Sequence, residues 1–122
     1  SFVEDLSKVP GEVVVNCVGL GARKLCQDNE VRPARGQVIF LDQDPGIGHF
    51  DQQPETLTYT IPRSDVTVLG GTAQVDDWGM DIRSEDNALI LEKVEALWPE
   101  LDRSKIIGGA VGLRPSRSEV RP

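Results

Sequence analysis

One arginine, Arg114, has the chemistry and the surroundings to hold a carboxylate. It follows an apolar run, between Leu113 and Pro115, where a solvated arginine is not expected. A partly buried arginine needs an anionic partner, and its planar fork matches a carboxylate through two parallel hydrogen bonds. That anion is either one of the chain's own Asp or Glu residues or the acid group of a ligand. The residue types alone leave both alternatives open.

Tyr59, the only tyrosine of the chain, is a second candidate. It alternates with Leu57 and Ile61, so a two-residue period predicts that these three side chains share one face of a strand. On this reading Tyr59 is at least partly buried, and a buried hydroxyl needs a hydrogen-bond partner. That partner is a group of the chain or a ligand.

Other chemistries find little support in the residue types. His49 is the only histidine, and Cys17 and Cys26 are nine positions apart, farther than paired zinc ligands usually are. No serine lies in a nucleophile-elbow sequence. We therefore expect no metal site and no catalytic triad, and we interpret Asp76 and Asp77 as a solvated turn. Two cysteines are also too few for a disulfide framework, which favours a reducing compartment.

The Gly19–Gly21 turn follows a valine-rich run and contains part of a dinucleotide-binding motif. That motif requires a small residue three positions after its second glycine, and Lys24 stands there instead. The motif therefore fails, although the turn remains compatible with a cofactor that touches it.

Composition limits the class of protein. The chain has 122 residues, 39% of them hydrophobic, with a net charge of −7, which is typical of one folded domain rather than a disordered segment. No run of about 18 apolar residues predicts a membrane span, and the acidic balance argues against a general nucleic-acid binder. The chain begins without Met and ends in a charged run, so we expect an excerpt of a longer protein.

The elements that must position these residues can be read from hydrophobic periodicity and turn signals. A short helix is expected over 22–27, and a longer one from an N-cap at Ser84 to about Trp98, before Pro99. Trp78 and Trp98 are assigned to packing. The order of elements predicts an α+β fold, with an antiparallel or mixed sheet and one long helix on one side. Strands are expected over 13–18, buried and parallel, and over 38–41, 57–61, 66–69 and 105–111, with a hairpin at 62–65.

Five segments, in this order, resemble the FAD-dependent D-amino-acid oxidase family, which includes D-aspartate oxidase. Each segment is weak alone, but their order and spacing make the match specific over nearly the whole chain. The segments are VVNCVGLGA at 14–22, RGQV at 35–38, YTIPR at 59–63, LGGT at 69–72 and VGLRP at 111–115.

The resemblance covers only the middle-to-late part of such an enzyme. It implies that 1–34 is the end of a Rossmann-like FAD domain, 35–111 a substrate-binding domain, and 112–122 a return segment toward the FAD domain. The segments that hold most of the FAD in this family are missing, so we expect the isolated chain to be inactive.

The resemblance also implies residue roles. Arg114 and Tyr59 match the pair that binds the substrate carboxylate, and Val18 and Gly19 lie in the turn that matches a position near FAD. Family chemistry transfers a hydride from the substrate Cα to the flavin, and oxygen then yields hydrogen peroxide. The imino acid hydrolyses to a 2-oxo acid and ammonia. No side chain need act as acid or base, so no catalytic residue is assigned.

Departures from the family pattern bear on the substrate. Glu55 stands where some members carry a lid tyrosine, and Ala73 stands where D-aspartate oxidases carry an extra arginine. Ala73 favours neutral D-amino acids, although Arg63 could supply a second cation. The alternatives are D-aspartate oxidase, a glycine or secondary-amine oxidase and, in a different class, a flavin-free carboxylate-binding module. The expected partners are a D-amino acid and oxygen, with no nucleic acid or membrane; a homodimer stays open. The implied location is cytoplasmic in a bacterium and peroxisomal in a eukaryote.

Overall fold

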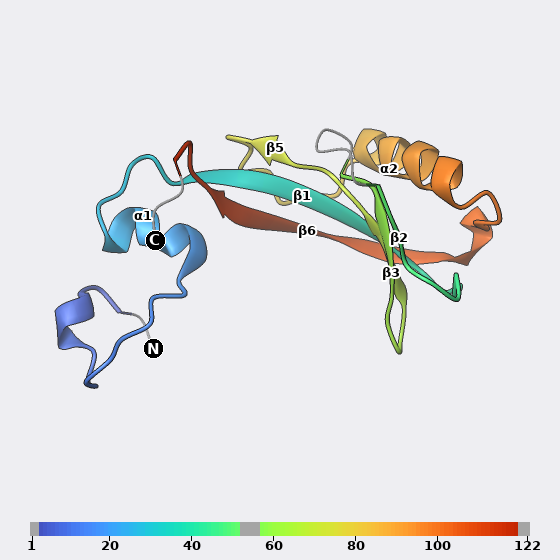
Figure 1. Ribbon diagram of the computed structural model, residues 1–122. Coiled ribbons are helices and arrows are strands. Elements are labelled where there is room, and N and C mark those ends of the chain that lie inside the picture. Colours follow the sequence, from blue (N-terminus) through green and yellow to red (C-terminus); the bar gives the residue numbers. More distant parts are fainter. Residues whose placement is uncertain (1–2, 52–56, 120–122) are drawn as a thin grey trace.

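A computed structural model describes residues 3–51 and 57–119 of the chain, and its centre is a single antiparallel sheet (Figure 1). Its middle strand pairs with a long strand on one edge and with two shorter strands, end to end, on the other. The six strands are β1 (Arg32–Leu41), β2 (His49–Phe50), β3 (Tyr59–Pro62), β4 (Thr67–Gly70), β5 (Gln74–Val75) and β6 (Ile106–Ser116).

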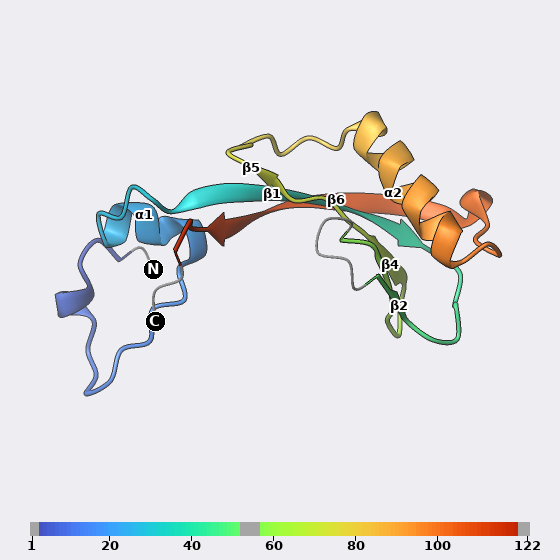
Figure 2. The same ribbon diagram turned by 45° about the horizontal axis from the view of Figure 1, so that its top comes forward.

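The long β1–β6 pair and the β3–β4 hairpin confirm the main strand predictions. β6 pairs with β1 from the Arg32–Ser116 pair to the Leu41–Ile106 pair, and Figure 2 shows the two strands running side by side along the molecule. The hairpin closes at 63–66, where the Arg63 amide donates to the Val66 carbonyl oxygen at 3.0 Å. β6 runs five residues beyond the predicted strand end at 111.

The helix α2 (Ser84–Leu97) covers one face of the sheet and forms the core with it (Figure 2). Trp98 caps its C-terminus directly before Pro99, as predicted. Its N-cap is Arg83, not Ser84, and no side chain caps this end. The buried side chains of the core cluster are Ile39, Leu41, Leu69, Ile90, Leu91, Val94 and Trp98.

A tertiary contact explains where α2 begins. The Gln37 side chain, projecting from β1, accepts from the Arg83 amide at 3.0 Å and donates to the Arg83 carbonyl oxygen at 2.7 Å. These two bonds hold Arg83 in an extended conformation at the helix entry. Ser84 instead becomes the first helical residue, and its hydroxyl lies 3.3 Å from a Glu85 carboxylate oxygen.

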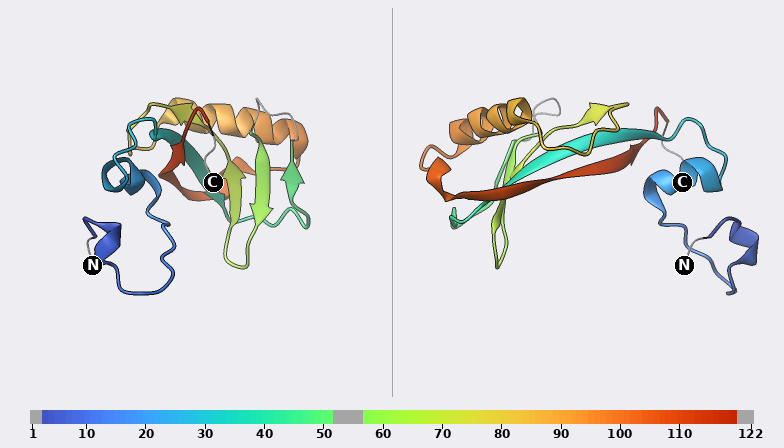
Figure 3. Two further views of the ribbon diagram at one scale, coloured as in Figure 1. Left: turned by 60° about the vertical axis from the view of Figure 1, so that its left-hand side comes forward. Right: turned by 180° about the vertical axis from the view of Figure 1, so that it is seen from behind.

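The predicted buried strand over 13–18 is wrong. These residues form no strand, and Val13 is 82% exposed. A strand needs hydrogen-bonding neighbours, and none of the described strands pairs with this segment. Figure 3 shows it beyond one end of the sheet, with the short helices η1 (Leu6–Lys8), η2 (Gly19–Gly21) and α1 (Ala22–Leu25), the last where a short helix was expected.

Burial along β3 differs from the expectation drawn from its apolar residues. Thr60 is 1% exposed and lies on the face that α2 covers, whereas Ile61 is 49% exposed on the opposite face. Leu57 precedes the strand, with a φ of 41°. Tyr59 is half-buried, as predicted. Trp78 is 56% exposed, so its assignment to packing is wrong, while Trp98 belongs to the core.

None of the helices in the described residues is both long and apolar enough to span a bilayer.

Candidate functional site

The sheet face opposite α2, called here the open face, carries both predicted carboxylate-binding residues. In the β1–β6 register Arg114 stands opposite Ala34, and the next pair on the same face is Gly36 with Gly112. Farther along, Val38 pairs with Gly70 of β4, which in turn pairs with Tyr59. Two long polar side chains thus border a floor of very small residues.

The Arg114 side chain lies flat across this floor. A Cβ on Gly36 would collide with Arg114 Nη1 and lie 2.8 Å from its Cζ, so only glycine leaves room for the guanidinium. Nη1 donates to the Thr72 carbonyl oxygen at 3.3 Å, and within the described residues Arg114 has no ion pair. Arg114 is exposed, so the expectation of a partly buried arginine is wrong for the described residues. Its guanidinium keeps donors available for an anion.

The Tyr59 ring lies over Gly70 in the same manner. A Cβ on Gly70 would collide with the ring, and a Cβ on Gly71 would lie 3.2 Å from the hydroxyl oxygen. Phe50 stacks on the ring, with the centroids 6.5 Å apart. Among the described residues, the Tyr59 hydroxyl has no hydrogen bond of its own.

The two side chains converge on one short segment of chain. Tyr59 reaches Gly71 with its hydroxyl, and Arg114 reaches Thr72, the next residue, with Nη1. A pocket of about 280 Å³ opens beside the guanidinium, lined by Gly36, Val38 and 110–114. Tyr59 and Arg114, the two residues that the resemblance implies for carboxylate binding, thus approach neighbouring residues of the chain; their binding role stays a prediction.

The turn predicted to contact a cofactor is open but offers few polar groups. Val18 is 44% exposed, its amide donates to Asn16 Oδ1, and its carbonyl oxygen accepts from the Gly21 amide. Gly19 has a φ of 57°, and no heavy atom would lie within 4 Å of a Cβ there. The open space at Gly19 and the exposed Val18 side chain leave room for a group to approach this turn.

The other arginines near these residues are engaged in ion pairs. Arg117 binds Asp28 at 3.0 Å and Glu30 at 2.5 Å, which ties the end of β6 to the segment before β1. Arg63 lies 3.5 Å from Asp65 at the exposed hairpin turn. Arg121 and Glu55 lie outside the described residues.

The Asp76–Asp77 pair forms a turn held by arginines. Asp76 binds Arg32 at 2.9 Å, and Asp77 binds Arg83 at 2.5 Å. The hydrogen bonds from Arg83 and the Gly79 amide lower the pKa of the Asp77 carboxyl to about 2. Both carboxylates thus have structural partners.

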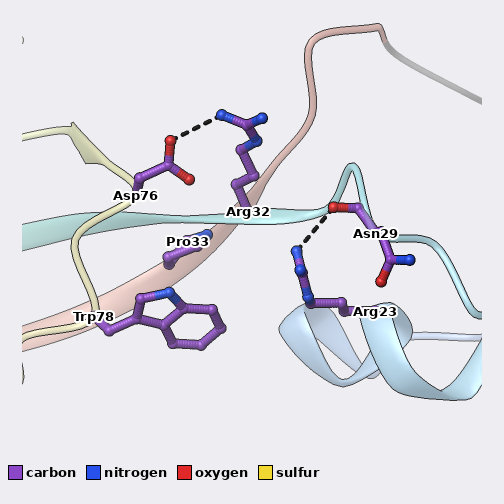
Figure 4. A pocket seen from close by; sticks show the side chains of 6 residues that line it. All are labelled: Arg23, Asn29, Arg32, Pro33, Asp76 and Trp78. Carbon is purple, nitrogen blue, oxygen red and sulfur yellow. Dashed lines mark hydrogen bonds and ion pairs between the residues drawn. The ribbon is translucent and has the colours of Figure 1, made fainter.

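A second pocket, of about 380 Å³, lies at the start of β1 (Figure 4). Arg23 donates through Nη1 to the carbonyl oxygens of Asn29 and Val31, both at 2.8 Å, while Arg32 is paired with Asp76. Trp78 flanks the opening. Since both guanidinium groups already serve the fold, this pocket offers less for an anion than the open face does. In the part of the chain that the structure describes, no cluster of His, Cys, Asp or Glu is placed to hold a metal ion.

Sequence reasoning missed the polar network beneath the open face. Arg35 is fully buried, and its guanidinium donates to the Asp86 carboxylate at 2.6 Å and to the Gln37 side chain at 2.7 Å. Its other acceptors are the Gly79 and Asp81 carbonyl oxygens and the Gln74 side chain. The signal was present in the sequence: Arg35 and Gln37 alternate into an apolar strand, which puts two polar side chains on its buried face.

Comparison with known proteins shows the family of the chain. The family described as FAD dependent oxidoreductase matches residues 3–122. A D-amino-acid oxidase of Streptomyces coelicolor is 41% identical over 123 residues, covering 98% of this chain and 38% of the relative. A D-aspartate oxidase of Homo sapiens is 42% identical over 110 residues, covering 90% of this chain and 32% of the relative.

A third relative, a D-amino-acid oxidase of Rubrobacter xylanophilus, is 41% identical over 113 residues, with 90% of this chain and 34% of the relative covered. The chain thus spans only about a third of the length of these curated relatives. Because the family match extends over nearly every residue, including both sides of the open face, the chain belongs to the FAD dependent oxidoreductase family.

Proposed function

We propose that the protein containing this chain oxidises neutral D-amino acids with FAD and oxygen, giving 2-oxo acids, ammonia and hydrogen peroxide. The observation that carries this proposal is the guanidinium of Arg114, which has no ion pair among the described residues and contacts Thr72, while the Tyr59 hydroxyl approaches the preceding residue, Gly71. An arginine whose donors are not engaged by the chain's own carboxylates can donate parallel, charge-assisted hydrogen bonds to the carboxylate of a ligand.

In this proposal the chain's own residues bind and orient the substrate. The Arg114 guanidinium donates two parallel hydrogen bonds to the carboxylate, and the Tyr59 hydroxyl donates a further one. This two-point grip fixes the direction in which the substrate Cα points, which is the contribution that orientation makes to catalysis. FAD, when bound, would accept the hydride and pass the electrons on to oxygen. No acid or base side chain is required.

The finer domain assignment belongs to the same proposal. We assign 1–34 to the end of a Rossmann-like FAD domain, in which Val18 and Gly19 approach the cofactor, and 35–111 to the substrate domain. The exposed valines of 13–15 support this assignment, since an apolar β-branched run needs strand neighbours that the described residues do not supply.

The preference for neutral substrates rests on the side chains next to the grip. Ala73 follows Thr72 and carries no charge, while Phe50 and Ile61 expose apolar surface on the Tyr59 side of the open face. Arg63 is paired with Asp65, which reduces its availability for a second carboxylate. Among the relatives, both D-amino-acid oxidases and D-aspartate oxidases occur.

The test of the grip compares two arginines in the full-length holoenzyme. Arg114→Ala is expected to raise KM for D-alanine by about a hundredfold or more, because a desolvated carboxylate loses its partner. Arg117→Ala serves as the control and should change KM far less, since Arg117 is engaged by Asp28 and Glu30. Equal effects would mean that Arg114 does not bind the carboxylate.

The alternative functions predict different results for the full-length protein. Turnover of D-aspartate or glycine faster than D-alanine would replace the substrate assignment while keeping the enzyme class. A flavin-free carboxylate-binding module predicts purified protein without visible flavin absorbance. Peroxide production by the 122-residue chain with added FAD would contradict our expectation that the chain alone is inactive.

A further inference from the structure

The edge of β1 that faces β4 and β5 has a break between these two strands. β4 ends at Gly70, opposite Val38, and β5 begins at Gln74, opposite Arg35. Gly36 and Gln37 therefore lack a strand partner on this edge. Thr72 occupies the break: its side-chain oxygen accepts from the Gln37 amide at 2.9 Å, and Thr72 itself is buried.

This bond places the Thr72 backbone next to the carboxylate grip. With the side chain of Thr72 bound to β1, its carbonyl oxygen accepts from Arg114 Nη1 at 3.3 Å. That carbonyl is the only hydrogen-bond acceptor that Arg114 has among the described residues. The position of the guanidinium thus depends on where Thr72 is held.

Gly36 also determines where the guanidinium lies, because it has no side chain. Cζ and both Nη atoms of Arg114 lie less than 3 Å from the place where a Cβ on Gly36 would stand. Any side chain there would lift the guanidinium off the floor and away from Thr72. Since the end of an arginine side chain is flexible, the change would displace the guanidinium rather than the strand.

We infer that Thr72 and Gly36 are positioning residues for carboxylate binding: together they hold the Arg114 guanidinium flat on the open face, beside Tyr59. This inference rests on the proposed function. An exposed arginine otherwise loses much rotamer freedom when a ligand binds, and a side chain held in place beforehand loses less.

Substitutions of glycine in the full-length holoenzyme test the positioning role of Gly36. Gly36→Ala is expected to raise both KM for D-alanine and Kd for propionate by about tenfold to a hundredfold, with a smaller change in kcat. Propionate is the probe because it keeps the carboxylate of D-alanine and lacks the amino group; its binding is followed through the flavin spectrum. Gly108→Ala is the matched control, since Gly108 is a β6 glycine whose Cβ would make an ordinary 3.9 Å contact with Phe40.

A double-mutant cycle shows whether Gly36 acts through Arg114. If it does, Gly36→Ala adds less than about twofold to the propionate Kd once Arg114→Ala is present, because coupled residues are not additive. Full additivity of the two changes would overturn the inference. So would a Gly36→Ala variant that binds propionate as Gly108→Ala does.

Thr72 is tested by an isosteric and a conservative replacement. Thr72→Val removes the acceptor of the Gln37 amide and should raise the propionate Kd by about three- to tenfold. Thr72→Ser keeps the hydroxyl and should restore binding to within about twofold of the wild type. Equal weakening by valine and serine would show that the hydroxyl does not position Arg114.

These outcomes separate the inference from the proposed function. Loss of binding in Arg114→Ala, together with normal binding in Gly36→Ala and Thr72→Val, removes the positioning roles and leaves the grip intact. Normal propionate binding in Arg114→Ala removes the grip itself, and the inference with it.

Discussion

Two arginines project from opposite faces of the same β1–β6 pair and have opposite environments. Arg35, on the face covered by α2, is fully buried, and five acceptors engage its guanidinium. Arg114, on the open face, is exposed, and within 3–51 and 57–119 it has one long hydrogen bond, to Thr72. The strands are shared and the residue type is the same, so the difference lies in the partners that the fold brings to each face.

The contrast distinguishes an arginine whose donors are used by the fold from one whose donors remain available to a ligand. A guanidinium has five N–H donors, and all of them are matched at Arg35, so that residue has no capacity for a ligand. Arg114 keeps most of its donors unused, and the floor of glycine beneath it provides space instead of acceptors. Residue type alone cannot distinguish the two, whereas the number of satisfied donors can.

The largest expected effect is on the buried arginine. Arg35→Leu should lower the free energy of unfolding by about 3–5 kcal/mol, because it leaves the Asp86 carboxylate buried without its cation. Chemical denaturation of the full-length protein measures this loss. Arg114→Leu is the matched control and should change stability by less than about 1 kcal/mol, as an exposed side chain does. Comparable losses of free energy of unfolding in the two variants would show that Arg114 stabilises the fold as much as Arg35 does.

A smaller effect is expected at the other half of the grip. Tyr59→Phe keeps the ring over Gly70 and removes only the hydroxyl, so KM for D-alanine should rise by about three- to tenfold, the value of one hydrogen bond. The thermal unfolding midpoint should stay close to that of the wild type. An unchanged KM with a lowered midpoint would instead assign the hydroxyl to the fold.

The smallest effect concerns Arg83. Its side chain is 34% exposed and paired with Asp77, so it is intermediate between buried Arg35 and exposed Arg114. Arg83 and the Gly79 amide lower the Asp77 pKa from 3.8 to about 2, so the folded state binds a proton at this carboxyl less readily than the unfolded state. The pair therefore stabilises the fold above about pH 4, and this contribution is lost as the pH falls toward 2.

The corresponding measurement is the denaturation midpoint of the wild type and of Asp77→Asn between pH 7 and pH 3. At neutral pH Asp77→Asn should have a lower free energy of unfolding than the wild type. This difference should shrink as the pH falls below about 4. A margin that grows as the pH falls would contradict the assigned direction of the pKa shift.

Local patterns were sufficient to predict several elements and to single out Arg114 and Tyr59 as candidates, whose binding role stays a prediction. The alternation and the turn residues around 62–65 indicated the hairpin, and Pro99 marked the end of α2, since these signals act within a few residues of chain. Arg114 was singled out because it is a charged residue that follows an apolar run. Tyr59 stood out through its alternation with apolar neighbours.

The failures all concern neighbours that lie far apart along the chain. Thr60 is buried although Ile61 is apolar, because the hairpin presents the threonine side to α2. The acceptors of Arg35 on 79–86 follow it by more than forty residues. The 13–18 run has the composition of a strand, yet none of the described strands pairs with it.

The sequence by itself determined which side chains have the chemistry to bind an anion and where most of the chain extends, turns or coils, because side-chain chemistry and short-range periodicity are properties of the residues. Only the tertiary structure decided that the Arg35 guanidinium is fully engaged by the chain, whereas that of Arg114 has a single acceptor among the residues that the structure describes. That outcome depends on which distant groups reach each face of β1, and hydrogen-bond partners are supplied by packing rather than by proximity along the chain.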